Sequence, residues 1–210
     1  MSDFVKNQNW RYATKKFDAA KKISTQDLNT LKEAIRLSSS SYGLQPYKVL
    51  IVENPELRSQ ILPAAWGQSQ IVEASHLLVF ANQTSISDSE IDAFFENMSK
   101  TREIPLETLL GYQGFMKSKI NELTEDAKEI WNSKQTYLAL GNLLNAAAEL
   151  KIDVTPMEGF DPAQVNEILG LDKLGLNASL MATIGYRHKE DATQHLKKVR
   201  KSNEELFITL

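Results

Sequence analysis

The segment TEDAKEIWNSKQTYLALGNLLNAAAEL, residues 124–150, constrains the fold of this chain more than any other stretch. Its apolar residues recur at helical spacing and cover more than one face of the predicted helix. They are Ile130, Tyr137, Leu138, Leu140, Leu143, Leu144, Ala147 and Leu150. A helix that is apolar most of the way round is buried on most sides. We therefore expect either a central spine or part of an interface between subunits.

Short apolar segments bounded by turn residues predict buried strands, and segments with helical periodicity and capping residues predict helices around them. The expected strands cover residues 47–53, 76–82, 152–160 and 179–187. The expected helices cover residues 2–9, 24–37, 55–66, 87–100, 105–123, 124–150 and 161–170, with a break near Pro63 and a weak point around Gly111 and Gly114. Short strands among many helices indicate a layered protein of mixed α and β structure.

A chain of 210 residues is long enough for one sizeable core, so we expect a single domain over residues 1–210. It has no cysteine, which excludes disulfides, thiol catalysis and cysteine-ligated metal. No apolar run approaches the roughly 18–20 residues of a membrane span, and the first residues show no signal-peptide pattern. We therefore expect a cytoplasmic protein that does not enter a membrane.

The formal charge is 24 − 27 = −3, so bulk attraction to nucleic acid is not expected. Basic residues nevertheless gather at both ends of the chain. They are Lys6, Arg11, Lys15, Lys16, Lys21 and Lys22 at the start, and Arg187, Lys189, Lys197, Lys198, Arg200 and Lys201 near the end. Each is open to the simpler interpretation of a solvated surface charge. If the two ends meet in the folded protein, they create an anion site.

Two turns beside predicted strands offer accessible backbone. SSSSYGLQP, residues 38–46, is either a flexible linker or a hydroxyl-rich turn at which a ligand approaches the chain. TPMEGFD, residues 155–161, places Glu158 beside Gly159 in a turn that offers N–H groups as readily as a carboxylate. Both turns are therefore candidates for ligand contact.

The chain contains no HExxH, GxSxG, GxxxxGK[ST] or GxGxxG sequence, and its three histidines lack metal-ligand spacing. His76, at the start of a strand, is interpreted as a packed or capping histidine. The two turns, with RYATK at 11–15 and KKVRK at 197–201, supply positive charge, hydroxyls and backbone donors but no nucleophile. Such a set suits a phosphorylated organic cofactor that brings its own reactivity, and no metal site is expected.

The polar tail after Arg187 ends in ELFITL. It is either an extended arm that adds an edge strand, on a partner subunit for example, or a frayed terminus. Composition alone favours neither interpretation.

Five segments together resemble one protein family. RYATKKFD, SSSSYGLQPYKVLIV, ASHLLVF, KQTYLALGNLLNAAAELKIDVTPMEGFD and KKVRK occur in the order and spacing of the FMN-dependent nitroreductase family. The similarity covers almost the whole chain and is closest to the branch of oxygen-insensitive NAD(P)H nitroreductases and dihydropteridine reductases. Residues 83–125, which carry substrate preference in the family, match least well. Aromatic residues there are candidates for stacking on a substrate or for helical core; they are Phe94, Phe95, Tyr112 and Phe115.

The resemblance implies an α+β, three-layer nitroreductase-like fold. Its central mixed or antiparallel sheet would have four to five strands flanked by helices. The C-terminal arm would be exchanged in a homodimer, with the long helix as the dimer core. One FMN would occupy each of two pockets at the subunit interface.

The resemblance also implies which residues bind the cofactor. Arg11, Tyr12, Ala13 and Lys15 would line the FMN phosphate and the pyrimidine edge of the ring, and Lys198 and Arg200 would hold the phosphate. The partner subunit would contribute the serine turn, and the long helix would contribute Gln135. The implied partner-supplied residues are Ser39, Ser40 and Ser41. The implied residues along the flavin face are Pro156, Met157, Glu158 and Gly159, with the Glu158 N–H directed to N5.

Four positions depart from the family pattern. Gly67 and Gln70 stand where an asparagine and a lysine usually contact the flavin ring, so one cation near N1 is lost. A charge contact in a partly buried site is worth about 1–3 kcal/mol. We therefore expect a lower flavin potential or weaker FMN binding unless Lys15 alone suffices. Tyr12 and Ala13 replace the commoner His and Ser, which we expect to remove small hydrogen bonds.

The resemblance implies an enzyme, an FMN-dependent NAD(P)H oxidoreductase working by ping-pong two-electron hydride transfer. NADH or NADPH would be the donor, and a nitroaromatic, a quinone or a related small molecule the acceptor. Lys15 and Glu158 would support chemistry that the flavin carries out, with no catalytic side chain. The alternatives are a flavin, dihydropteridine or enone reductase on the same scaffold, or a flavin-binding protein with little turnover.

Overall fold

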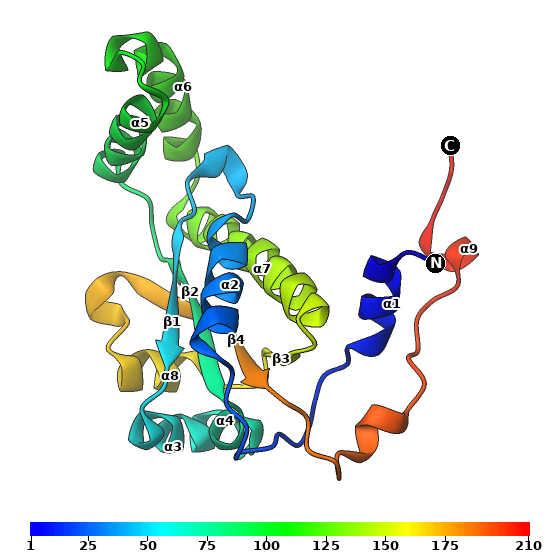
Figure 1. Cartoon of the computed structure of the whole chain (residues 1–210). Helices are drawn as coiled ribbons and strands as arrows, with labels where there is room; N and C mark the ends of the chain where they lie inside the picture. Colours follow the sequence, from blue (N-terminus) through cyan, green and yellow to red (C-terminus); the bar gives the residue numbers. More distant parts are fainter.

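All 210 residues are described by the structure, a computed structural model (Figure 1). Its centre is one antiparallel sheet with the strand order β1-β2-β4-β3. The strands are β1 (Tyr47–Val52), β2 (His76–Gln83), β3 (Asp153–Met157) and β4 (Leu176–Gly185). The predicted number of strands is therefore confirmed, and the α+β class with it.

The chain also forms nine α-helices, and none of them is long and apolar enough to cross a membrane. They are α1 (Asp3–Trp10), α2 (Thr25–Arg36), α3 (Pro55–Ala64), α4 (Gln70–Glu73), α5 (Asp88–Arg102), α6 (Leu110–Asn121), α7 (Glu125–Glu149), α8 (Pro162–Leu169) and α9 (Asn203–Leu206). Most begin where a short polar side chain accepts a hydrogen bond from the first turn. These N-caps are Ser2, Ser24, Asn54, Ser87, Thr124, Asp161 and Ser202.

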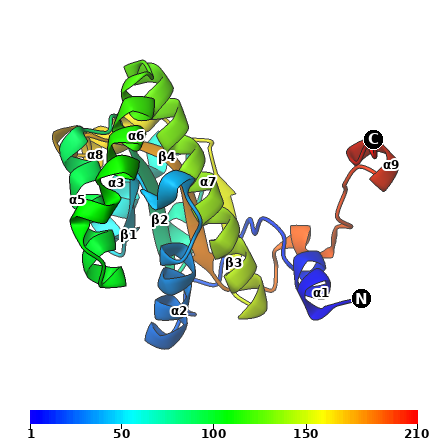
Figure 2. The ribbon, with the colours of Figure 1, turned by 90° about the horizontal axis from the view of Figure 1, so that it is seen from above.

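The protein has three layers because side chains of β2 and β4 alternate between the two faces of the sheet (Figure 2). Leu77 and Val79 face a core that α3, α4 and α8 complete. Leu78 and Phe80 face a second core completed by α2 and α7. Both cores are closed by fully buried apolar side chains, so β2 is buried along nearly its whole length.

Helix α7 lies against the second core with one side, where Ala139, Leu143 and Ala147 are fully buried. Its opposite side leaves Ile130 and Leu138 about half exposed, at 56% and 49%. The long segment is therefore the spine of the monomer, and it also carries an unburied apolar face.

Helices α5 and α6 project away from the sheet as a pair with a small core of their own (Figure 1). The expected weak point at Gly111 and Gly114 was wrong, because α6 runs unbroken through both glycines. Glycine costs only about 1 kcal/mol in a helix interior, and burial of Met116 and Ile120 offsets that cost. Phe95 is fully buried, as expected for a core residue.

Two strand boundaries and one helix differ from the sequence predictions in ways that the packing explains. The last strand begins at Leu176, not at residue 179, because Leu176 and Ala178 are buried and pair with the end of β2. The strand predicted over 152–160 ends at Met157, where the chain turns. The four-residue helix α4 was not predicted, since it is too short to show helical periodicity.

Beyond Arg187 the chain runs with α1 along one side of the body (Figures 1 and 2). Residues 203–206 form a helical turn, and the exposed residues that follow pair with no strand of the chain. ELFITL therefore adds no strand to its own sheet. Exchange of this arm with a partner subunit stays a prediction.

Candidate functional site

The two basic ends of the chain meet, as the clustering of charge suggested. The Lys198 ammonium donates hydrogen bonds to the carbonyl oxygens of Gln8 and Arg11, the latter at 2.6 Å. The His188 N–H donates to the Lys16 carbonyl at 2.9 Å, and Phe17 pairs with Arg187 in an isolated bridge. Segments nearly the whole chain length apart are thereby joined into one structure.

A cavity of about 510 Å3 lies at this junction. Its lining combines residues 9–13, Leu144 of α7, Pro156 of β3 and the basic tail. Six sequence-predicted residues line it: Arg11, Tyr12, Ala13, Pro156, Lys198 and Arg200. The structure thus brings together predicted residues from three separate segments.

Positive charge in this cavity has no counter-charge on the protein. Arg11, Lys198 and Arg200 take part in no ion pair. Burial and the nearby Arg200 lower the pKa of Arg11. Burial, then Arg11 and Arg200, lower the pKa of Lys198. Three cations that repel one another favour an anionic ligand between them.

Backbone donors are available beside these cations. The N–H groups of Tyr12 and Ala13, which both line the cavity, make no hydrogen bond within the chain. Buried or partly buried amides are normally paired. The cavity therefore offers neutral donors as well as charge to a ligand.

Tyr12 is fixed in place from two sides. The Arg187 guanidinium lies 4.5 Å from the centre of the Tyr12 ring and 4.3 Å from the centre of the Trp10 ring. The same guanidinium forms a two-pronged ion pair with buried Asp153, with a closest distance of 2.6 Å. A flat cation held between two rings orders the chain before the cavity.

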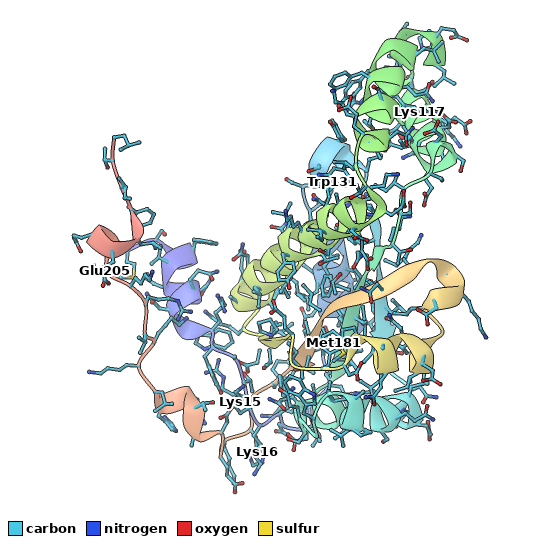
Figure 3. The ribbon with its side chains drawn as sticks, turned by 180° about the vertical axis from the view of Figure 1, so that it is seen from behind. Lys15, Lys16, Lys117, Trp131, Met181 and Glu205 are labelled. Carbon is cyan, nitrogen blue, oxygen red and sulfur yellow. The ribbon has the colours of Figure 1, made fainter.

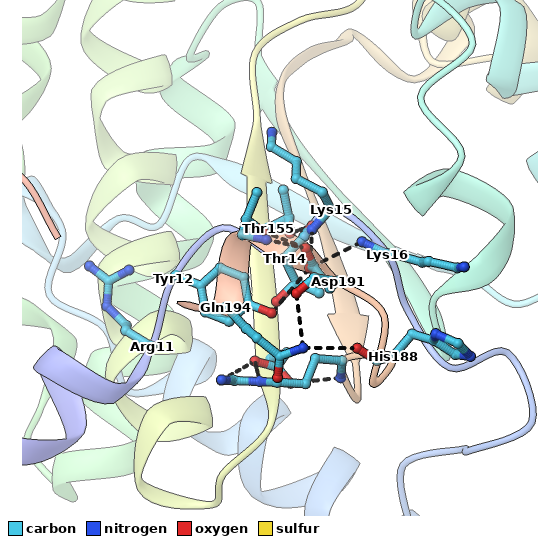
Figure 4. Close-up of polar contacts among 12 residues, drawn as sticks. Arg11, Tyr12, Thr14, Lys15, Lys16, Thr155, His188, Asp191 and Gln194 are labelled. Carbon is cyan, nitrogen blue, oxygen red and sulfur yellow. Dashed lines mark hydrogen bonds and ion pairs between the residues drawn. The ribbon is translucent and has the colours of Figure 1, made fainter. Parts of the chain in front are cut away.

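Asp191 is the residue of this site that sequence reasoning missed. Its carboxylate, only 3% exposed, accepts hydrogen bonds from Tyr12, Lys15, Lys16 and Thr193 (Figure 4). Burial raises its pKa, but the hydrogen bonds from Thr193, Lys15 and Lys16 outweigh burial and bring it down to about 2. In the sequence it is one acid beside another in KED, so only the fold reveals its partners.

The hydroxyl of Tyr12 donates to Asp191 at 3.1 Å. Tyr12 thus makes a hydrogen bond of its own here, and the loss of the bonds made by the commoner His stays a prediction. The longer side chain reaches an acceptor that lies across the junction, on the tail.

Lys15 and Lys16 lie at the boundary between the body and the terminal arm and point in different directions (Figures 3 and 4). Lys16 forms an ion pair with Glu190 at 2.6 Å. The Lys15 ammonium makes no hydrogen bond and no ion pair, although its backbone is fixed by Asp191. Lys15 is thus an oriented but unneutralised cation.

The turn after β3 is braced from two directions. Glu158 accepts a 2.6 Å hydrogen bond from the Tyr137 hydroxyl on α7, and burial together with this carboxylate raises the pKa of Tyr137 to about 12. A Cβ atom at Gly159 would lie 2.9 Å from the ring of Trp66, so a larger residue here would have to displace that exposed ring. The Gly159 carbonyl accepts from Gln68 at 2.7 Å.

The remaining residues expected along the turn, Pro156 and Met157, differ in exposure. Pro156 is exposed and lines the cavity, whereas Met157 packs into the core at 4% exposure. Of the two, only Pro156 presents its side chain to the cavity.

Gly67 lies in the connection between α3 and α4, next to this turn, and Gln70 is the first residue of α4. Gly67 has a φ of +70°, and Trp66 before it has a φ of +55°, so the chain reverses sharply here. Gln70 is 5% exposed, yet its side-chain amide makes no hydrogen bond to the rest of the chain. That amide remains free to contact a ligand.

The serine turn is anchored, which excludes the flexible-linker interpretation. The Ser41 N–H donates to Gln135 Oε1 at 2.8 Å, and the Ser40 hydroxyl accepts from the Gln45 N–H at 3.0 Å. Ser39 is exposed at its start. Gln135 also donates to the Trp131 carbonyl at 2.9 Å, so the oxygen and the nitrogen of its amide each make one hydrogen bond within the chain.

This turn is tied to α7 at two places: Ser38 accepts from the Asn142 amide at 2.9 Å, and Ser41 donates to Gln135. Gln8 of α1, beside the cavity, is tied to Asn145 at 3.0 Å. Ten helical residues separate Gln135 from Asn145, which corresponds to about 15 Å along the axis, so Ser41 lies at the end of the turn that is farther from the cavity. One chain therefore contains two candidate ligand-binding surfaces at different places.

His76 is packed, as expected. It is 8% exposed, its Nδ1 lies 3.0 Å from the Ser75 hydroxyl, and its Nε2 lies 3.2 Å from Glu53. Burial lowers its pKa. It belongs to a different surface from the cavity at the chain ends.

Comparison with known proteins is consistent across sequence and structure. The family model described as "Nitroreductase family" matches residues 9–186. YfkO of Bacillus subtilis, provisionally named an NAD(P)H nitroreductase, is 36% identical over 193 residues, which is 87% of each chain. The major NAD(P)H-flavin oxidoreductase of Aliivibrio fischeri is 33% identical over 207 residues, which is 95% of each chain.

Solved structures of nitroreductase-type proteins share this fold. A nitroreductase-type protein of Exiguobacterium sibiricum 255-15, solved in complex with FMN, superimposes with a TM-score of 0.85 at 18% identity. The alignment covers 100% of this chain and 98% of that one. With the family model matching most of its length and relatives above 30% identity along nearly all of it, this chain belongs to the nitroreductase family of oxidoreductases.

Proposed function

We propose that this chain is an FMN-dependent NAD(P)H oxidoreductase that reduces nitroaromatics, quinones or related electron-poor acceptors. The observation that carries the proposal is the cavity of three unneutralised cations at the junction of the chain ends. A phosphate monoester supplies the charge that this cavity lacks. The names of the relatives, which include a flavin oxidoreductase, support the same cofactor.

In this proposal the phosphate lies among Arg11, Lys198 and Arg200. The free N–H groups of Tyr12 and Ala13 add donors next to the guanidinium of Arg11. Charge-assisted hydrogen bonds of this kind contribute about 1.5–3 kcal/mol each. The phosphate end would therefore fix the cofactor in the cavity.

The residues around the ring would tune its charge. The free ammonium of Lys15 would stabilise negative charge at the pyrimidine edge. Gly67 supplies no side chain there, and the Gln70 amide supplies a neutral donor where the family usually has a cation. We expect the resulting flavin potential to be lower than in relatives that keep the lysine.

When bound, the flavin supplies reversible two-electron hydride chemistry. The chain would bind and orient the flavin. The segment Pro156–Gly159, which contacts Tyr137 and Trp66, would present its backbone to the edge of the flavin ring. The proposed order is ping-pong, in which NADH or NADPH binds, is oxidised and leaves before the acceptor binds. No side chain is assigned as a general acid, because water can supply protons.

We further propose that the site is completed in a homodimer. The exposed apolar face of α7 supports an interface, because large unpaired apolar surfaces mark association sites. The tie of Ser41 to Gln135 lies about 15 Å along α7 from the tie of Gln8 to Asn145, beside the cavity, which supports a role for Ser39, Ser40 and Ser41 toward the partner's flavin. The exposed arm at 207–210 would pair with the partner's sheet.

The direct test is optical. Purified protein should be yellow, should bleach anaerobically when NADH or NADPH is added, and should regain its colour with a nitroaromatic or quinone. A colourless protein that FMN cannot reconstitute would contradict the proposal. Colour without bleaching would favour the alternative of a flavin-binding protein with little turnover, and acceptor profiling would separate the flavin, dihydropteridine and enone reductase alternatives.

A further inference from the structure

Residues 11–16 of the candidate site contain no helix or strand. Such a segment needs other contacts if Arg11 and Lys15 are to point in defined directions. The backbone donors of Lys15 and Lys16 both end on one atom, Asp191 Oδ2, at 2.8 and 3.2 Å. The Tyr12 hydroxyl reaches the same oxygen.

The other oxygen of this carboxylate is fixed by the tail. Asp191 Oδ1 accepts from the Thr193 N–H at 3.0 Å and from the Thr193 hydroxyl at 2.5 Å. Each oxygen therefore serves a different chain end, Oδ2 the N-terminal segment and Oδ1 the tail. Figure 4 shows the two segments converging on this side chain, with Lys15 extending away from it.

We propose that Asp191 is the positioning residue of the nitroreductase site in this chain: its carboxylate docks residues 12–16 onto the tail and thereby aims Arg11 and Lys15 at the ligand. This inference rests on the proposed function for the identity of the ligand. The docking role is inferred from the contacts of the carboxylate, which act beside the hydrogen bonds from His188 to the Lys16 carbonyl and from Thr155 to the Thr14 carbonyl.

The proposal and simple charge balance predict opposite effects of an Asp191 substitution on the affinity for an anion. Removing a negative charge near Arg11, Lys198 and Arg200 should strengthen binding of an anion by Coulomb attraction alone. If Asp191 acts by positioning, Asp191→Asn should instead weaken binding. In Asp191→Asn, the side-chain NH2 would replace one of the two oxygens. It would then face backbone N–H donors, and an NH2 group cannot accept their hydrogen bonds.

The matched control is Glu190→Gln. Glu190 is the adjacent residue, its substitution changes the charge equally, and its side chain is 61% exposed. It contacts Lys16 and His188 but not Tyr12 or Lys15.

The experiment titrates the apoprotein of each variant with FMN and, separately, with riboflavin. Flavin fluorescence gives the dissociation constant of each complex. We expect Asp191→Asn to bind FMN about 10- to 100-fold more weakly, riboflavin less affected, and Glu190→Gln within about twofold of the wild type. Cooperative unfolding of each variant shows that it is folded. Equal or tighter FMN binding by Asp191→Asn would overturn the inference.

A second readout needs no ligand and separates this inference from the proposed function. In Asp191→Asn, the amides of Lys15 and Lys16 should exchange hydrogen at least about tenfold faster, while amides of β2 stay protected. Unchanged exchange would overturn the docking role even if FMN binds. Failure of the wild type to bind FMN would count against the proposed function, and the exchange result would still decide the role of Asp191.

Discussion

The sheet-centred body and the junction of the chain ends are held together by different interactions. In the body, β2 inserts Leu77, Leu78, Val79 and Phe80 alternately into two apolar cores, all of them at most 1% exposed. At the junction, two buried carboxylates, Asp153 and Asp191, bind the segments through ion pairs and hydrogen bonds. Apolar burial is non-directional, whereas a carboxylate with several donors fixes geometry.

The difference separates stability from ligand binding. Loss of apolar contacts in the body should lower the free energy of unfolding of the whole chain. Loss of polar contacts at the junction should change how the cations are placed while leaving the cores intact. Three predictions test this division, from the largest expected effect to the smallest.

Leu78→Ala, at 1% exposure in the second core, should lower the free energy of unfolding by about 2–5 kcal/mol. The matched control is Leu174→Ala, the same substitution at 65% exposure, which should change it by no more than about 0.5 kcal/mol. Chemical denaturation measures both. Similar losses from the two substitutions would mean that the body is not stabilised mainly by its buried layers.

Lys198→Ala combined with Arg200→Ala should weaken FMN binding by about 2–4 kcal/mol, roughly 30- to 1,000-fold, because two cations of the cavity are removed. Titration of apoprotein with FMN measures the effect, and Lys173→Ala, on the far side of the sheet beside β4, is the control for charge. Unchanged affinity in the double variant would show that the tail is not the phosphate site.

Asp191 should make stability depend on acid pH. Its pKa in the folded protein, about 2, is below the ordinary value of 3.8, so the ionised form is favoured by folding. This contribution, about 2 kcal/mol, is present above pH 4 and lost as the pH falls through about 2. The unfolding free energies of wild type and Asp191→Asn should therefore converge between pH 5 and pH 2. A constant difference over that range would contradict the pKa.

The prediction of a nitroreductase rested on five segments in register, and the family model and relatives confirm it. The same five segments predicted FMN as the cofactor and NAD(P)H as the electron donor. The relatives' names and the cations of the cavity agree with this prediction. The flavin-contacting roles of the individual residues, the exchanged arm and the choice between NADH and NADPH stay predictions.

The sequence by itself determined the long helix, the four strands and the concentration of positive charge at the two ends. These features are local, because each depends on a repeat of apolar residues or on neighbouring charges that can be seen within one segment. The contacts of Lys198 with the N-terminal segment, and the unbroken course of α6, depend on packing that no single segment contains.

Only the tertiary structure decided that Asp191 binds Lys15 and that Arg187 lies between Trp10 and Tyr12. Lys15 and Asp191 are 176 positions apart, and an acid in a polar tail has the same sequence pattern whether it is solvated or buried. A hydrogen bond depends on the direction of its donors, and those directions exist only once the sheet has brought the two ends together.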